Sequence, residues 1–185
     1  MVDRKRAENA VRELLAAIGE DVTREGLRET PERVARMLEE LTAGYADRAE
    51  EHLGKTFAES GSALVIERDI AFSSTCEHHL MPFFGRVHIA YVPDGKVAGL
   101  SKLARTVEVY ARRLQLQERM NAQIADAIYR HLAPKGVAVV VEAEHTCMTA
   151  RGVKKTGSST VTCAVRGEIS DGVVAQLLSY AGERR

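Results

Sequence analysis

Near the middle of the sequence, one thiol and two imidazoles stand within four positions, at Cys76, His78 and His79. Cys76 and His79 are three positions apart, so one helical turn or tight loop would direct both side chains toward one point, as in half of a zinc site. We expect the second half at His145 and Cys147, because residues two apart on an extended segment share a face. The sequence therefore predicts a metal site built from two distant segments.

The number of candidate ligands leaves two interpretations of this site open. Zinc takes four protein ligands in a structural site, and three protein ligands plus water in a catalytic one. If Cys76, His79, His145 and Cys147 all bind the ion, the site is a structural staple. His78 is a fifth candidate. If Cys76, His79 and Cys147 suffice, the two histidines His78 and His145 remain beside the metal, where imidazoles can transfer protons. A domain of this size hardly needs a staple to fold, which favours the catalytic interpretation.

The N-terminal third of the chain is predicted to be helical. Apolar residues at helical spacing indicate one helix that ends at Gly19 and a second that begins with Thr30 as its N-cap. Residues 46–62 are polar and indicate a linking loop. We therefore expect a helical arm over residues 1–62, followed by a main domain over residues 63–185.

In the main domain, apolar residues recur with a period of two in some segments, as in strands, and with a period near 3.6 in others, as in helices. We expect strands at 63–72, with a kink, and at 87–91, helices at 101–114 and 120–132, strands at 137–147 and 161–165, and a short helix at 171–180. The order β-β-α-α-β-β is typical of an α+β domain whose antiparallel sheet is covered by helices on one face. Four strands leave two open edges and one bare face, which favours oligomerisation.

Composition limits the possible partners and compartments. The 185 residues include 26 Lys plus Arg and 26 Asp plus Glu, so the net charge of zero gives no reason to expect a nucleic-acid partner. The sequence contains no apolar run near the ~20 residues that cross a bilayer, and its N-terminus lacks the apolar core of a signal peptide. We expect a cytoplasmic protein without membrane contacts. In that compartment, the three cysteines favour metal binding or catalysis over a disulfide framework.

The remaining cysteine and histidines are expected to be structural. Cys163 lies within an apolar strand pattern, which indicates a small buried hydrophobic residue. His52, His88 and His131 stand alone in the sequence, and each is expected at the surface or at a helix end.

Two basic clusters point to an anionic ligand. Ser101 at the expected start of a helix would offer free backbone N–H groups beside Lys102 and Arg105, an arrangement that can hold a phosphate. Arg151 follows the second metal segment and precedes the pair 154–155 of lysines, to which we assign no role. Each cluster alone is weak support, but beside a metal site they predict a phosphorylated ligand.

Two further sets of residues remain ambiguous from the sequence alone. The carboxylate of Glu118 beside the amide of Gln117 could read adjacent N–H donors on a purine edge, such as those of guanine. Without further context, a glutamate at a helix start is better explained by its favourable interaction with the helix dipole. Arg33 and Arg36 lie off the apolar stripe of their helix, which is typical of solvated surface.

Four segments resemble the zinc-dependent GTP cyclohydrolase I family, in the same order and at fitting intervals. They are Cys76-Glu77-His78-His79, Gly99-Leu100-Ser101-Lys102-Leu103-Ala104-Arg105, Gln115-Leu116-Gln117-Glu118-Arg119 and His145-Thr146-Cys147-Met148-Thr149-Ala150-Arg151-Gly152. Gly26-Leu27 and Thr30-Pro31-Glu32-Arg33-Val34-Ala35 extend the resemblance into the N-terminal arm, so it covers nearly the whole chain.

The resemblance implies a fold, an assembly and a reaction. The fold is the tunnelling fold, in which subunits join their sheets side by side into a barrel and two rings stack into a homodecamer. The reaction converts GTP and water into 7,8-dihydroneopterin triphosphate and formate, the first step toward tetrahydrofolate and related pterins.

The resemblance also implies roles at the reacting centre. Cys76, His79 and Cys147 would hold zinc and leave its fourth position to a water that attacks C8 of the guanine ring. His78, His145 and Ser101 would assist the proton transfers and the later rearrangement of the ribose.

Further roles concern the rest of the nucleotide. Glu118, helped by Gln117, would anchor the guanine edge. The triphosphate ligands would be Lys102, Arg105 and Arg151, together with Arg33 and Arg36 from a neighbouring subunit. Arg36 stands where the family often has lysine, which keeps the charge but changes its geometry.

Two other functions remain open at this point. One is a tunnelling-fold enzyme acting on another pterin or deazapurine, such as a nitrile reductase or a pyruvoyl-pterin synthase. The other is a zinc-stapled binding module without turnover. The combination of Cys-Glu-His-His with His-Thr-Cys favours the cyclohydrolase.

Overall fold

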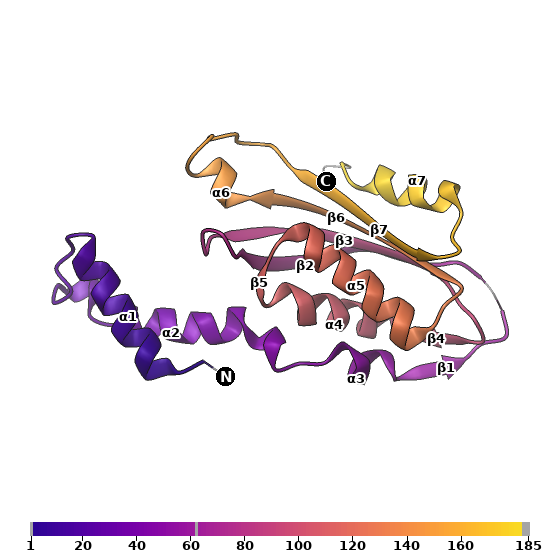
Figure 1. Cartoon of the computed structure of the whole chain (residues 1–185), viewed down its shortest axis with the longest axis horizontal. Coiled ribbons are helices and arrows are strands. Elements are labelled where there is room, and N and C mark those ends of the chain that lie inside the picture. Colours follow the sequence, from indigo (N-terminus) through magenta and orange to yellow (C-terminus); the bar gives the residue numbers. More distant parts are fainter. Residues whose placement is uncertain (1, 62, 183–185) are drawn as a thin grey trace.

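The computed structural model of the chain describes residues 2–61 and 63–182. Its N-terminal arm consists of α1 (Arg4–Ala17), the 3-10 turn η1 (Glu25–Leu27) and α2 (Thr30–Leu41), as the apolar spacing predicted. Helices α1 and α2 pack against each other and project beyond one end of the main body (Figure 1). The N-cap of α2 is Glu29 rather than Thr30, which is the first helical residue.

The segment after α2 is more ordered than predicted. After η2 (Ala43–Tyr45) it forms α3 (Ala49–Leu53) and β1 (Thr56–Ala58), where we expected a loop over residues 46–62. Ala49 and Leu53 are buried, because they lie four positions apart on one face of α3 and pack toward the body. A single apolar pair in a charged run gives no periodic pattern, so the sequence did not reveal this helix. The domain boundary that we expected at residue 62 lies outside the described residues.

The main body is an α+β fold around a five-stranded sheet. Strands β2 (Val65–Cys76), β3 (Pro82–Val92), β6 (Gly136–His145) and β7 (Thr160–Gly167) are antiparallel neighbours in that order. A two-residue strand, β5 (Leu114–Gln115), pairs in parallel with the end of β2. The predicted kink in β2 is a shift of register between Glu67 and Ile70, with Asp69 at φ 61°. The strand β4 (Lys96–Ala98) pairs separately with β1.

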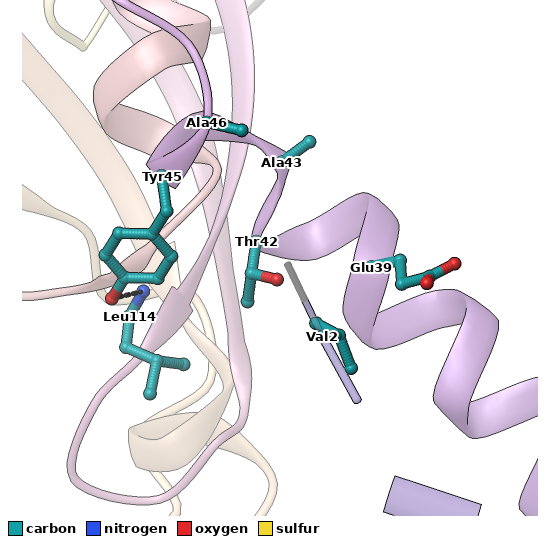
Figure 2. A pocket seen from close by; sticks show the side chains of 7 residues that line it. All are labelled: Val2, Glu39, Thr42, Ala43, Tyr45, Ala46 and Leu114. Atoms are coloured by element: carbon teal, nitrogen blue, oxygen red, sulfur yellow. Dashed lines mark hydrogen bonds between the residues drawn. The ribbon is translucent and has the colours of Figure 1, made fainter. Parts of the chain in front are cut away.

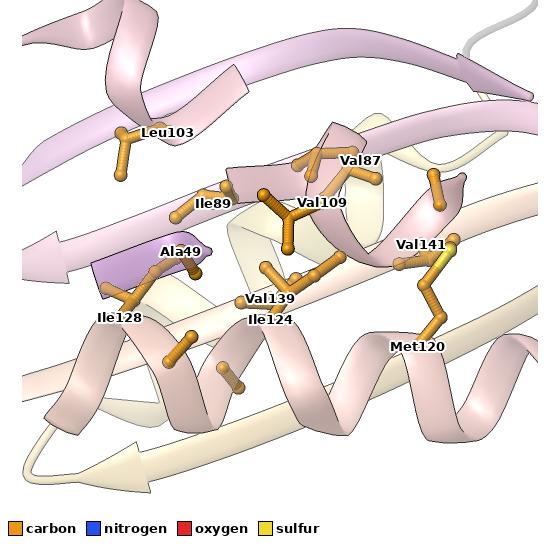
Figure 3. Close-up of a cluster of buried hydrophobic side chains, with 14 of the residues drawn as sticks. Ala49, Val87, Ile89, Leu103, Val109, Met120, Ile124, Ile128, Val139 and Val141 are labelled. Carbon is orange, nitrogen blue, oxygen red and sulfur yellow. The ribbon is translucent and has the colours of Figure 1, made fainter. Parts of the chain in front are cut away.

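Helices α4 (Leu100–Ala111) and α5 (Gln117–Leu132) cover one face of this sheet. Alternate strand residues such as Val87, Ile89, Val139 and Val141 point toward the helices and form the main core with Ile124 and its neighbours (Figure 3). The period of two directs the intervening residues to the other face. There Ala90, Ala138 and Val140 pack against Leu177 of α7 (Asp171–Tyr180), so this face is partly covered rather than bare.

Two predictions about single residues were wrong. His88 is fully buried on the α7 side of β3, where its Nδ1 accepts a hydrogen bond from the Asp69 backbone N–H at 3.2 Å. Cys163 is exposed, because β7 is an edge strand and Cys163 points away from α5. His52 and His131 lie near helix ends, as expected.

Candidate active site

The first metal-binding segment is the loop between β2 and β3. Cys76 ends β2, and the chain reverses over residues 77–81 before Pro82 begins β3. The Cys76 N–H donates to the Met81 carbonyl at 2.8 Å, and the Leu80 N–H donates to the Cys76 carbonyl at 2.9 Å. Leu80 adopts φ 53°, a left-handed conformation that closes the turn. This tight loop brings His79 back toward Cys76.

The second segment does not have the predicted extended shape. β6 ends at His145, and the chain enters a helical turn, α6 (Thr146–Thr149), in place of a strand reaching Cys147. The Thr146 hydroxyl donates to the Pro82 carbonyl at 2.6 Å and ties this turn to β3. His145 and Cys147 therefore do not share a strand face. Cys147 turns toward the loop after β2, whereas His145 stays on the sheet.

Cys76, His79 and Cys147 form a cluster with the donor set of a zinc site. One ligand atom from each lies within 4.8 Å of the others. Tetrahedral zinc with Zn–S bonds near 2.3 Å separates two sulfurs by about 3.8 Å, which is compatible with atoms that all lie within 4.8 Å of one another. Burial and the neighbouring Cys76 thiol raise the pKa of Cys147, so a cation there would replace a proton.

The cluster has three donors, which bears on the choice between staple and catalytic site. Among residues 2–61 and 63–182, neither His145 nor His78 joins this group. A three-donor site leaves one tetrahedral position for water or substrate. The geometry therefore supports the catalytic interpretation over the four-ligand staple.

Side chains behind the loop hold it against the body. Arg119 of α5 forms an ion pair with Glu77, the residue next to Cys76, and its Nε donates to Gln115 Oε1 at 3.0 Å. The hydrogen bond from Arg119 also lowers the pKa of Glu77. The Glu77 N–H donates to the Gln115 carbonyl at 3.1 Å. Glu77 thus holds the loop against α5 and β5.

His145 lies beside the metal donors with its ring held on two sides. The ring stacks on Phe83, with centroids 4.7 Å apart and planes at 7°. Its Nε2 lies 2.8 Å from Gln117 Oε1. Burial lowers the pKa of His145, and the charge of the nearby Glu118 partly opposes this shift. His78 is exposed on the loop, with its ring centroid 6.2 Å from that of His79.

Gln117 does not have the exposed position that reading a base requires. Only 1% of the residue is exposed, and its Nε2 donates to Val141 O, Thr160 O and Thr162 Oγ1 at 3.0, 2.9 and 3.2 Å. The side chain is engaged inside the protein, so its expected contact with guanine is not supported. Glu118, the next residue, is exposed in the first turn of α5. The sequence could not show whether Gln117 or Glu118 faces the sheet.

Ser101 and Lys102 lie away from the metal donors of their own chain. The N-cap of α4 is Gly99, so Ser101 does not cap the helix as predicted. The α4 start adjoins the far end of β3, because the Ala98 N–H donates to the Tyr91 hydroxyl at 3.3 Å. Roughly 15 Å of helix separate Ser101 from the other end of α4, which adjoins β5 and Cys76.

The predicted arginines fall into three places. Arg151 follows α6 close to Cys147, and its charge acts against the rise in the pKa of that thiol. Arg105 lines a different cavity, on the outer side of α4. Arg33 and Arg36 lie on the projecting arm, where each pairs with an acid one turn earlier, at 2.6 and 3.0 Å. One chain therefore brings only Arg151 of this set to the metal donors.

A cavity of about 500 Å³ lies where the arm meets the body (Figure 2). Its lining is Val2, Glu39, Thr42, Ala43, Tyr45, Ala46 and Leu114. The Leu114 N–H donates to the Tyr45 hydroxyl at 3.2 Å across it. The lining includes none of the residues predicted to do chemistry, so this cavity is not the candidate site.

Comparison with known proteins agrees with this geometry. The family model described as GTP cyclohydrolase I matches residues 7–179. A protein of Clostridium kluyveri named GTP cyclohydrolase 1 is 59% identical over 166 residues, 90% of each chain. One of Carboxydothermus hydrogenoformans with the same name is 57% identical over 182 residues, 98% of this chain and 95% of its own.

A solved structure supports the fold. The archaeosine synthase QueF-Like in its apo form superposes with a TM-score of 0.50 at 20% identity, covering 60% of this chain and all of that one. This likeness concerns the fold alone, and it agrees with the tunnelling fold expected from the sequence. With the family model spanning most of the chain and relatives this similar, the chain belongs to the GTP cyclohydrolase I family.

Proposed function

We propose that this chain converts GTP and water into 7,8-dihydroneopterin triphosphate and formate by opening the guanine imidazole ring at C8. The observation that carries the proposal is the three-donor cluster of Cys76, His79 and Cys147, with His145 nearby and outside that cluster. A structural staple would leave no open position and would need no histidine alongside it. Family membership supplies the reaction that uses such a centre.

Two thiols and one imidazole suit zinc, and we propose that Cys76, His79 and Cys147 hold it. Zinc so bound supplies Lewis acidity and lowers the pKa of a water molecule toward about 7. Burial of Cys76 limits access to the ion from the body side, while the exposed His79 leaves the outer side open to substrate.

The residues around this centre divide the work on the substrate. The exposed Glu118 carboxylate is suited to accept hydrogen bonds from guanine N1–H and the 2-amino group. His145 and the exposed His78 are suited to transfer protons as the ring opens and formate leaves. Arg151 is suited to bind the triphosphate, since it is exposed close to Cys147.

The other predicted ligands require more than one copy of the chain. Ser101, Lys102 and Arg105 lie toward the far part of α4, so we propose that a neighbouring subunit supplies them to each centre. Strands β5 and β7 are sheet edges that could pair between copies. The projecting arm could carry Arg33 and Arg36 to another subunit. We propose a homodecamer with active sites shared between subunits.

The cellular setting is proposed from the same reasoning. We propose that the product feeds tetrahydrofolate or pterin synthesis in the cytoplasm, with no nucleic-acid or membrane partner. Within residues 2–61 and 63–182, no helix combines the length and apolarity that a bilayer crossing needs.

The decisive experiment incubates the zinc-loaded protein with GTP and measures formate together with the fluorescent neopterin formed after oxidation. Both products should appear in equal amounts and disappear after zinc is removed with a chelator. A binding module would release neither, and another tunnelling-fold enzyme would leave GTP unchanged. Absence of both products from a fully zinc-loaded protein would refute the proposal.

A further inference from the structure

Gln117 joins the active-site histidine to the sheet, and its amide orientation can be determined from its partners. Val141 O of β6 and Thr160 O of β7 are backbone carbonyls, which only accept hydrogen bonds. The side-chain nitrogen of Gln117 must therefore face the strands. Asparagine and glutamine amides are often ambiguous, but an amide between two carbonyls is not.

This orientation determines which nitrogen of His145 carries hydrogen. With Nε2 of Gln117 on the strands, its Oε1 faces His145 Nε2 at 2.8 Å. An amide oxygen can only accept, so His145 Nε2 must be protonated. In a neutral imidazole, Nδ1 then keeps the lone pair. Among the described residues, Gln117 is the hydrogen-bond partner of this ring, and Nδ1 is left for substrate.

The ring has little freedom to escape this arrangement. Phe83 stacks on it at 4.7 Å with planes at 7°, which fixes the ring plane. The hydrogen bond that His145 Nε2–H donates to Gln117 Oε1 fixes rotation within that plane. The partner of His145 is the neutral amide of Gln117, which selects the Nε2–H tautomer. Unlike a carboxylate partner, it brings no negative charge that would stabilise the imidazolium form.

We propose that Gln117 is a positioning residue that acts through His145, holding its hydrogen on Nε2 and presenting Nδ1 as the atom that exchanges a proton with the substrate. This inference rests on the proposed function, and it replaces the expectation that Gln117 reads the guanine edge. A residue that reads the base affects substrate binding directly. A residue that positions His145 has no effect once His145 is removed.

The same helix offers a matched control. Asn121 lies one turn after Gln117, is 1% exposed, and donates from Nδ2 to the same Thr162 Oγ1 at 3.1 Å. Within the described part of the chain, Asn121 makes no hydrogen bond with His145. Gln117→Met and Asn121→Leu therefore both remove a buried amide from one face of α5, but only the first should release the histidine.

The first measurement is a double-mutant cycle in GTP turnover. Gln117→Met should lower kcat on the order of 10²-fold, the lower end of what general acid–base catalysis contributes, with KM changed less than about threefold. On the His145→Ala background it should cost nothing further. Asn121→Leu should leave both constants within about threefold of wild type. A raised KM with kcat retained, or an equal loss without His145, would overturn the inference.

The second measurement needs no turnover. Solid-state ¹⁵N spectra of histidine-labelled wild-type protein, with the His145 pair assigned by its loss in His145→Ala, should show protonated Nε2 and unprotonated Nδ1. Gln117→Met should convert this pair to a mixture of tautomers, and Asn121→Leu should preserve it. An Nδ1–H tautomer in the wild type would refute the inference even if GTP is converted. The expected tautomer in a protein that does not convert GTP would instead fault only the proposed function.

Discussion

Gly85 controls the spacing of the two strands that present the active site. It pairs with Ala143 across β3 and β6, two residues from the pair formed by Phe83 and His145. A Cβ at position 85 would lie 1.8 Å from the Glu142 carbonyl oxygen and 2.7 Å from the Ala143 Cα. Both neighbours are backbone atoms and cannot rotate away. Any side chain here must therefore push the strands apart.

The displacement and its cost can be worked out for Gly85→Ala. Real Cβ contacts do not fall below 3.0 Å, so the strands would separate locally by about 1.2 Å. Overpacking of this kind costs about 1–3 kcal/mol. At about 2–4 °C per kcal/mol for a chain of this size, the melting temperature should fall by several degrees. Misplacing His145 by about 1 Å should lower kcat on the order of 10²-fold.

The assay measures melting temperature, zinc content and kcat on the same preparations. Zinc should be retained, because the three candidate donors lie at the end of β2, in the following loop and in α6 rather than in the β3–β6 pair at Gly85. Gly172→Ala in α7 is the matched control, since the nearest atom to its Cβ is Ser170 Oγ at 4.0 Å. It should leave kcat unchanged and stability unchanged or slightly increased. Wild-type stability and turnover in Gly85→Ala would show that the strands are not this close.

The remaining predictions concern the metal, pH and the shared site. Metal analysis should show that Cys147→Ser loses zinc while Cys163→Ser retains it. Because the pKa of Cys147 is raised, zinc must displace its proton, so zinc affinity should weaken on acidification by about tenfold per pH unit for each displaced proton. Burial lowers the pKa of His88 in the folded chain. Below pH 6.5, the ordinary pKa of histidine, His88 is therefore protonated in the unfolded chain before it is protonated in the folded one, and the free energy of unfolding falls as the pH decreases. Urea titrations should show that slope, up to about 1.4 kcal/mol per pH unit, reduced in His88→Asn. Lys102→Ala and Glu118→Ala should each be inactive. When the two variants are unfolded and refolded together, some mixed interfaces should combine an intact Glu118 with an intact Lys102 from the other chain, so part of the activity should return. No recovery would mean that both residues of one site come from one chain.

The long elements were predictable because each repeats its pattern several times. α5 shows apolar residues at helical spacing over four turns, and β3 alternates through Val87, Ile89 and Tyr91. α3, β1 and β5 are too short to establish a period, and their order comes from packing against elements distant in sequence. His88 was misjudged for a related reason, since only the placement of α7 over β3 buries it.

The site shows a different limit. Residue types alone indicated a metal site with Cys76, His79, His145 and Cys147 as the main candidates, because few functions other than metal binding require thiols and imidazoles at that density. Only the family resemblance reduced this set to Cys76, His79 and Cys147. The geometric argument for the second segment was nevertheless wrong, since an extended chain would have aimed His145 and Cys147 together. The turn into α6 separates them, so that Cys147 joins the three-donor cluster and His145 contacts Gln117. The Thr146 hydroxyl fastens that turn to the Pro82 carbonyl, a contact between residues 64 positions apart that the local sequence does not reveal.

The separation of Ser101 from Cys76 has a consequence for how activity depends on assembly. α4 spans the body from the far end of β3 to β5, so a chain presents its metal donors at one end and its Ser101 and Lys102 at the other. If copies join through their sheet edges, the metal donors of one chain can lie next to Ser101 and Lys102 of another. A single chain could bring these residues together only by removing α4 from the core. Turnover should therefore require assembly, whereas zinc binding by Cys76, His79 and Cys147 should not, because all three donors belong to one chain.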